Sequence, residues 1–171
     1  RADITLHEIR ALGGTAERYV ADVTDRAQVD ATVEAVLTRF RRVDILVNAV
    51  GRSAARAPFA EHDGQSWDET IDVNLRSVLH GSRAVLPHMI AQGSGRIVSV
   101  SSDAGRSGAP GQAVYSAAKA AVGAFTKALA QEVAAHGITV NAVSPGSVNN
   151  APFRERMARP EFRELVESLI S

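Results

Sequence analysis

Short apolar runs alternate with amphipathic helical stretches along most of this chain. The runs at residues 43–51 (VDILVNAVG), 95–102 (GRIVSVSS) and 138–146 (ITVNAVSPG) are rich in β-branched residues, as buried strands are. Around them, residues 25–40, 66–92 and 114–133 place apolar side chains at helical spacing. This alternation predicts a doubly wound parallel α/β sheet with helices on both faces.

Local signals set the expected element boundaries. Residues 16–21 (AERYVA) predict a further short strand, and Thr24 or Asp25 can cap the helix that follows. Ser66 and Glu69 form a capping box that is expected to start the helix ending near residue 92. Pro87 is expected to kink or shorten that helix.

Two titratable side chains lie four residues apart in the last helical stretch. Tyr115 and Lys119 share one face of the helix, and the chain has only two tyrosines and two lysines. An ammonium beside a phenol stabilises the phenolate and so makes the phenol more useful for proton transfer at neutral pH. The alternative is an ordinary surface pair on a helix.

Three further features accompany this pair. Ser102 ends an apolar run, where the carboxyl ends of parallel strands bind ligands. Asn74 interrupts an apolar helical pattern, and a Pro-Gly turn at 145–146 ends the last apolar run. With these spacings, residues 15–150 resemble the short-chain dehydrogenase/reductase family.

The resemblance implies a Rossmann-like fold that is incomplete here. The chain begins at Arg1, and no Gly-rich phosphate loop follows a strand in its first part. In the family, two strands lie between those expected at 16–21 and 43–48, so their absence would leave buried peptide groups unpaired. We therefore expect residues 1–171 to form one partial domain of a longer chain.

The resemblance also implies an NAD(P)-dependent oxidoreductase that interconverts a carbonyl and a secondary alcohol. Tyr115 would transfer the proton, Lys119 would assist it and hold the nicotinamide ribose, and Ser102 would bind the substrate oxygen. Asn74 would distort its helix and position a water, unless it is simply a tolerated exposed residue. NAD and NADP cannot be distinguished, because the dinucleotide fingerprint is not in view.

The implied cofactor site draws on several loops. Asp22 would accept from the adenine amine, unless it only caps a helix. The Asn48 to Gly51 turn matches the family pattern at its two ends but departs from it at Ala49 and Val50. The full implied set is Asp22, Val23, Asn48, Ala49, Gly51, Val73, Tyr115, Lys119, Pro145, Gly146, Val148 and Asn150.

Substrate and assembly follow from the same resemblance. The SSDAGRSGAPGQAVYSAAK stretch resembles enzymes acting on 3-oxoacyl or 3-hydroxyacyl thioesters and on related alicyclic alcohols. Residues 151–171 read as two short helices split by Pro160, where the family places its substrate lid. The arginines there (Arg154, Arg156, Arg159 and Arg163) either meet a carrier-bound phosphate or cover solvated helix faces. Small residues along the 114–133 helix indicate a homodimer or homotetramer, or else internal packing alone.

Composition narrows the remaining classes. The formal net charge is zero, so nucleic acid and anionic membranes are not indicated as partners. No cysteine is present and the five histidines lack ligand spacing, so we expect no metal site. With no signal peptide or membrane-length apolar run, the expected location is cytoplasmic. The competing function is a catalytically silent dinucleotide-binding or scaffold protein of the same fold.

Overall fold

Three parallel strands form the centre of the computed structural model, which describes residues 2–53, 56–148, 154–155 and 157–168. They are β1 (Ile45–Asn48), β2 (Gly95–Val100) and β3 (Ile138–Val143), in the order β1-β2-β3. Ile97 of the central strand lies opposite Leu46 on one side and Val140 on the other. The predicted strands at these positions, and the parallel α/β class, are confirmed.

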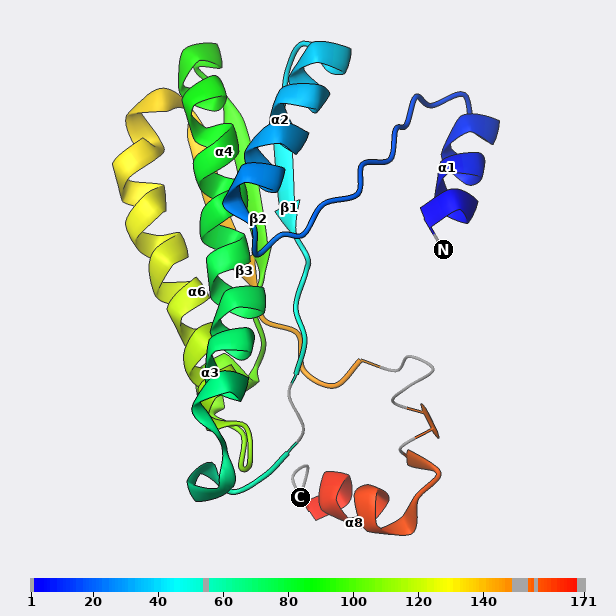
Figure 1. Ribbon diagram of the computed structural model, residues 1–171, viewed down its shortest axis with the longest axis vertical. Helices are drawn as coiled ribbons and strands as arrows, with labels where there is room; N and C mark the ends of the chain where they lie inside the picture. Colours follow the sequence, from blue (N-terminus) through cyan, green and yellow to red (C-terminus); the bar gives the residue numbers. More distant parts are fainter. Residues whose placement is uncertain (1, 54–55, 149–153, 156, 169–171) are drawn as a thin grey trace.

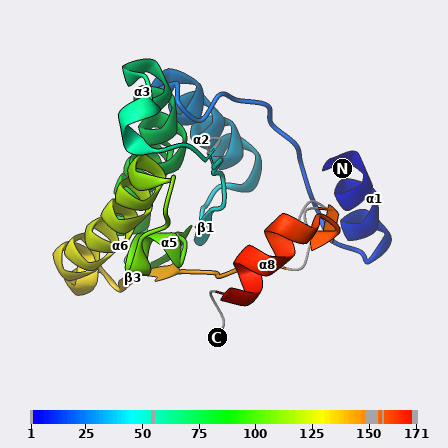
Figure 2. The same ribbon diagram turned by 90° about the horizontal axis from the view of Figure 1, so that it is seen from below.

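Three long helices cover one face of this sheet (Figures 1 and 2). They are α2 (Arg26–Phe40), α4 (Ser77–Gln92) and α6 (Ala113–Val133). Because strand side chains alternate, Ile97, Ile138 and Val140 all point into this layer, where they pack with Val85 and Met89 of α4 and Leu129 and Val133 of α6. Each such buried side chain stabilises the fold by roughly 1.5–3 kcal/mol relative to leaving it in water.

The opposite face of the sheet carries apolar side chains that the described residues leave open. Ile45 is 63% exposed, Val47 57% and Val143 49%. β1 is therefore apolar on both faces, which is the pattern of a strand in a sheet with helices on both sides. The doubly wound class predicted from the sequence is confirmed as an incomplete one.

The strand predicted at 16–21 does not form, and this expectation was wrong. Residues 14–22 are extended but irregular, and Val20 is 88% exposed. A strand needs a neighbour for its peptide groups, and no described strand lies beside this segment. It links α1 (Ala2–Ala11), which lies apart from the sheet in Figure 1, to α2.

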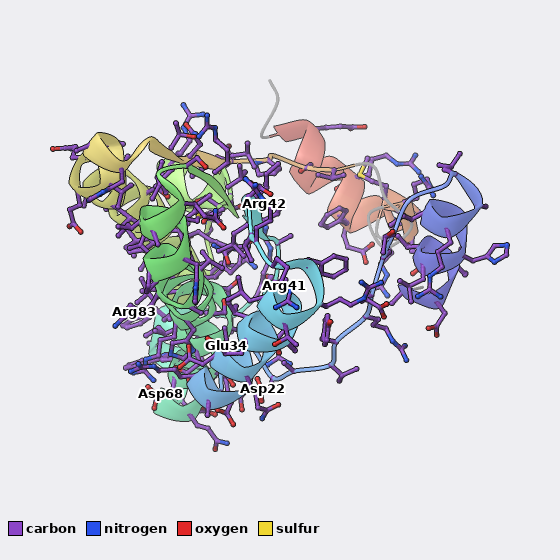
Figure 3. All side chains as sticks on the ribbon, turned by 90° about the horizontal axis from the view of Figure 1, so that it is seen from above. Asp22, Glu34, Arg41, Arg42, Asp68 and Arg83 are labelled. Atoms are coloured by element: carbon purple, nitrogen blue, oxygen red, sulfur yellow. The ribbon has the colours of Figure 1, made fainter. Side chains whose placement is uncertain are left out.

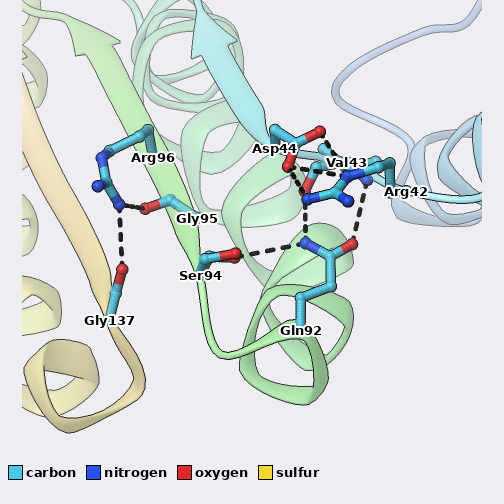
Figure 4. Close-up of polar contacts among 8 residues, drawn as sticks. All are labelled: Arg42, Val43, Asp44, Gln92, Ser94, Gly95, Arg96 and Gly137. Carbon is cyan, nitrogen blue, oxygen red and sulfur yellow. Dashed lines mark hydrogen bonds and ion pairs between the residues drawn. The ribbon is translucent and has the colours of Figure 1, made fainter.

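Side-chain hydrogen bonds join the strands at their amino ends (Figure 4). The Gln92 amide donates to the carbonyl oxygens of Val43 (3.0 Å) and Ser94 (3.4 Å), and it accepts from the Val43 amide (3.4 Å). Arg96 donates to the carbonyl oxygens of Gly95 (2.8 Å) and Gly137 (3.0 Å). These contacts stabilise the end of the sheet opposite the predicted site.

The helix expected from residue 66 begins earlier and contains an irregular turn. Asp63 caps α3 (Gly64–Ile71) by accepting from the Ser66 amide, so Ser66 is not the cap. A π-helical turn, η2 (Asp72–Arg76), joins α3 to α4, and α4 continues through Pro87 to Gln92 without being shortened. Asp25 caps α2 as predicted.

The remaining described elements are short. They are η1 (Phe59–Glu61), α5 (Ala104–Ser107), η3 (Ala134–His136) and α8 (Pro160–Ser168). Pro160 begins α8, which lies apart from the sheet (Figures 1 and 2). None of the helices in the described part of the chain has the length and apolar character needed to cross a membrane.

Candidate active site

Loops at the carboxyl ends of the strands are joined by main-chain hydrogen bonds. The Ser101 amide donates to the Val143 carbonyl (2.8 Å), and the Asp103 amide donates to the Pro145 carbonyl (3.0 Å). Ser102 lies between these two anchored residues. The predicted residues at 102 and 145–146 are therefore brought to the same edge of the sheet.

Lys119 reaches this edge from α6. Lys119 is only 3% exposed, and its ammonium Nζ donates to the Val100 carbonyl at 2.8 Å. The Nζ atom lies 5.9 Å from the centroid of the Tyr115 ring, which is within the range of a cation–π interaction. The predicted pair is therefore close in space. Burial lowers the pKa of Lys119 from its ordinary value of 10.5.

The turn that carries Ser102 packs closely against α6. The Ser101 hydroxyl donates to the Lys119 carbonyl at 2.7 Å. A Cβ on Gly105 would lie only 2.7 Å from the Lys119 carbonyl carbon, so this position admits glycine alone without a backbone shift. The sequence analysis missed both residues; a serine pair and a glycine after the strand were their only signals.

The described hydrogen bonds of Ser102 leave its hydroxyl proton unused. The Ser102 Oγ accepts a hydrogen bond from the Ala104 amide at 3.2 Å. Among the residues that the structure describes, its hydroxyl hydrogen has no acceptor and can be donated to a substrate oxygen.

Asn74 is fully buried in the π-helical turn η2. Its Oδ1 accepts from the Arg52 amide (3.1 Å), and its Nδ2 donates to the carbonyls of Arg52 (2.8 Å) and Thr70 (2.9 Å). The expected helix distortion is present, and Asn74 is not an exposed residue. The Asn74 amide fixes the chain just after Gly51. A Cβ added to Gly51 would lie 3.0 Å from both Asn74 Oδ1 and Lys119 Nζ.

The predicted cofactor residues on β1 and the segment before α2 share a cleft of about 210 Å³. Val23, Asn48 and Ala49 line it together with Ala21, Val29 and Val33. The Asn48 side chain, however, points into the helical layer, where its Nδ2 donates to Ser99 Oγ (3.2 Å) and Ser82 Oγ (3.4 Å). These bonds occupy the Asn48 Nδ2 donor, so its N–H groups are turned away from a cofactor.

Asp22 is exposed at the start of the turn before α2 (Figure 3). Its Oδ1 accepts from the Thr24 hydroxyl (2.7 Å) and the Thr24 amide (2.9 Å). These hydrogen bonds hold the pKa of Asp22 below its ordinary value, so the group is a carboxylate at neutral pH.

The other predicted cofactor residues differ in how far they are engaged. The Val73 carbonyl accepts from the Ser77 hydroxyl at 2.7 Å within the helix. A Cβ on Gly146 would meet nothing within 4 Å, and Val148 is 56% exposed, so both border open space. Asn150 lies outside the described residues.

A second set of contacts, also missed from the sequence, joins two loops beside Tyr115. The Gln112 side-chain Nε2 donates to Ser53 Oγ, and the Ala57 main-chain amide donates to the Gly111 carbonyl (3.1 Å). Arg56 donates to the Pro110 carbonyl at 3.2 Å. Gln112 precedes the first turn of α6, so these bonds fix the loop after β1 next to Tyr115.

The site contains no described metal centre. Within the described ranges, no group of three or more His, Cys, Asp or Glu side chains is placed to hold a metal ion. Ser102, Tyr115 and Lys119 offer hydrogen bonding, proton transfer and charge stabilisation.

A model of the family described as short chain dehydrogenase matches residues 1–161. The chain is 42% identical over 157 residues to the 3-oxoacyl-(acyl-carrier-protein) reductase FabG of Thermotoga maritima, which covers 91% of the chain and 62% of that protein. It resembles an NAD+-bound xylitol dehydrogenase with a TM-score of 0.87 at 33% identity, over 93% of the chain and 61% of that structure.

A gluconate 5-dehydrogenase from Burkholderia cenocepacia, in complex with NADP and tartrate, is similar with a TM-score of 0.86 at 32% identity, over 95% of the chain and 63% of that structure. The chain thus spans about three fifths of the length of these relatives.

Gly51→Ala is expected to lower the free energy of unfolding by about 1–2 kcal/mol, because the new methyl must displace Asn74 or Lys119 from a buried hydrogen bond. Gly123→Ala on α6 is the matched control, since its Cβ would meet nothing within 4 Å. The control is expected to raise stability by about 0.5–1 kcal/mol. Urea unfolding measures both, and equal effects would contradict the close packing around Gly51.

The lowered pKa of Lys119 has a defined consequence for stability. Between that lowered pKa and 10.5, the unfolded chain binds more protons than the folded chain, so the free energy of unfolding rises with pH. Lys119→Met removes this rise, whereas Lys127→Met, at an exposed position of the same helix, retains it. Urea unfolding from neutral pH to 10.5 measures the difference, and parallel curves for the two variants would exclude a depressed Lys119.

Proposed function

The chain belongs to the short-chain dehydrogenase family, and from this we propose that it interconverts a carbonyl and a secondary alcohol with NAD(P). The observation that carries the proposal is the buried Lys119 ammonium, held by the Val100 carbonyl at 2.8 Å beside the Tyr115 ring. Burying an ammonium costs free energy unless it is hydrogen-bonded or paired. A buried lysine whose described neighbour is a phenol is therefore a candidate functional group.

The catalytic step uses three side chains of this chain. Tyr115 donates its phenolic proton to the carbonyl oxygen, or removes the alcohol proton in the reverse direction. Lys119 stabilises the negative charge left on the phenol oxygen. Ser102 donates its free hydroxyl hydrogen to the same substrate oxygen and stabilises charge developing there.

A bound nicotinamide would supply or accept the hydride, and the residues present fit such a group. Among the described residues, Val100 takes one of the three N–H donors of Lys119, which leaves two for ribose hydroxyls. Gly51 permits close backbone approach beside this ammonium. Asp22 offers a carboxylate to the adenine amine, and its neighbour Val23 lines the cleft together with Asn48 and Ala49. Asn74 holds the Arg52 main chain, and the water role predicted for it stays a prediction.

The choice between NAD and NADP stays open. One similar structure is described as bound to NAD+ and another as a complex with NADP. Pro145, Gly146 and Val148 border the open side of the site and fit a nicotinamide carboxamide there. The contact proposed for Asn150 is part of the same prediction.

For the substrate, we favour a 3-oxoacyl thioester. Support comes from the Thermotoga relative, which is named a 3-oxoacyl-(acyl-carrier-protein) reductase. Residues 151–171 are proposed as the lid over this substrate, with α8 as its described helix. The predicted cytoplasmic location stays a prediction.

A homodimer or homotetramer is proposed through α6. Ala117, Ala120 and Ala124 form an exposed stripe of small residues that allows close helix approach. Light scattering is expected to give at least twice the monomer mass, and Ala117→Glu is expected to reduce it. A monomeric wild type would contradict this assembly.

Tyr115→Phe is expected to lower kcat about 10²- to 10⁴-fold, because it removes the proton that the carbonyl oxygen needs. Cofactor affinity is expected to stay within about twofold, since the ring and Lys119 remain. The measurement is oxidation of the reduced dinucleotide in the presence of a 3-oxoacyl thioester, with binding followed by calorimetry.

Tyr19→Phe is the matched control, because Tyr19 is the other tyrosine and is 39% exposed in the segment before α2. It is expected to retain wild-type turnover. Near-wild-type turnover by Tyr115→Phe would refute the assignment of the proton donor. Dinucleotide binding by the wild type without turnover of any carbonyl or alcohol would favour the silent scaffold.

A further inference from the structure

We propose that His80 is a positioning residue for the adenine end of the cofactor, an inference that rests on the proposed function. His80 is half-buried on α4, and its Nδ1 lies 3.3 Å from the carbonyl oxygen of Val23. A carbonyl only accepts, so Nδ1 carries the proton in this contact. The contact joins residues 57 positions apart in the chain.

The peptide group between Val23 and Thr24 is held at both ends. His80 holds its carbonyl oxygen, and Asp22 Oδ1 accepts from its N–H at 2.9 Å. Because a peptide group is planar, fixing the oxygen also fixes the direction of the N–H. The His80 ring therefore sets the orientation of the carboxylate that is proposed to meet the adenine amine.

The other described hydrogen bonds of this turn are local. The Asp25 amide donates to the Asp22 carbonyl (3.1 Å), and the Asp22 amide donates to Gln28 Oε1 (3.0 Å). Gln28 Nε2 donates to Asp25 Oδ2 (2.9 Å). These bonds shape the turn but leave its position relative to α4 and β1 to packing and to His80.

That position matters because the cleft beside the turn has two walls. Ala21 and Val23 form one wall, and Asn48, the last residue of β1, forms another with Ala49. An apolar cleft whose lining residues Ala21 and Val23 flank Asp22 in the chain suits a flat ring that carries an amino group. A shift of the turn would change the spacing of these walls and move Asp22 out of reach of that amino group.

The test compares a dinucleotide with a cofactor that lacks adenosine. NADH, NADPH and reduced nicotinamide mononucleotide are titrated calorimetrically into wild type and His80→Phe, which keeps the ring volume but removes the donor. We expect His80→Phe to weaken binding of the preferred dinucleotide about 5- to 10-fold, the loss expected for one hydrogen bond to an ordered turn. Binding of the mononucleotide is expected to change less than about twofold.

Two further variants make the result specific. His80→Asn places an N–H donor near the position of Nδ1 and is expected to restore dinucleotide affinity to within about twofold of wild type. His88→Phe is the matched control on the same helix, because His88 Nε2 lies 3.8 Å from Glu34 Oε1 of α2 rather than against the Val23 carbonyl. It is expected to bind both cofactors as wild type does.

Each outcome has a distinct meaning. Unchanged dinucleotide affinity in His80→Phe, or failure of His80→Asn to restore it, would overturn the positioning role. Equal weakening of dinucleotide and mononucleotide would show a general structural effect and overturn it as well. A wild type that binds no dinucleotide would instead refute the proposed function, and the role of His80 would fall with it.

Discussion

The hydrogen bond from the Lys119 ammonium to the Val100 carbonyl determines how the helical layer meets the functional end of the sheet. An ammonium removed from water needs acceptors close by, and this one obtains a strand carbonyl at 2.8 Å. To bring the two together, the backbone of α6 must approach the end of β2 closely. Gly105 permits that approach, and Ser101 adds a hydroxyl contact to the Lys119 carbonyl. The contacts that position Lys119 in the site are therefore the same contacts that pack α6 against the end of the sheet.

The Asn74 side chain holds the loop after β1 close to the same ammonium. The Asn74 side-chain amide pairs with the Arg52 main chain twice. Its Oδ1 accepts from the Arg52 N–H, and its Nδ2 donates to the Arg52 C=O. A primary amide carries a separate acceptor oxygen and two N–H donors, so it can pair with both groups at once, which explains why an asparagine stands here in an apolar pattern. The π-helical turn brings it to the loop, and Gly51 leaves room for both Asn74 and Lys119.

Sequence patterns predicted what depends on periodicity and missed what depends on three-dimensional neighbours. The three strands, the long helices and the Tyr115–Lys119 pair follow from spacing along the chain. The strand at 16–21 did not, because β-branched content cannot supply the adjacent strand that pairing requires. The Asn48 side chain turned inward because Ser82 and Ser99 offered it buried partners, which no local motif reveals. Asp63 caps α3 in place of the expected Ser66. Both side chains carry an acceptor oxygen and lie three residues apart, so the sequence alone did not decide between them.

The two halves of the proposed cofactor site are held with very different stiffness. The half around Lys119 is fixed by buried groups: a strand carbonyl, an asparagine amide and glycines that exclude side chains. The half around Asp22 is an exposed turn whose hydrogen bonds are mostly internal. A ligand that spans both halves gains affinity only if their separation is set before it binds. The contact between His80 and the Val23 carbonyl ties the second half to α4, whose amino end continues from the π-helical turn that holds the first. One helix thereby relates the two halves, which is why a residue distant from the chemistry is expected to affect binding of the dinucleotide and not of its nicotinamide portion.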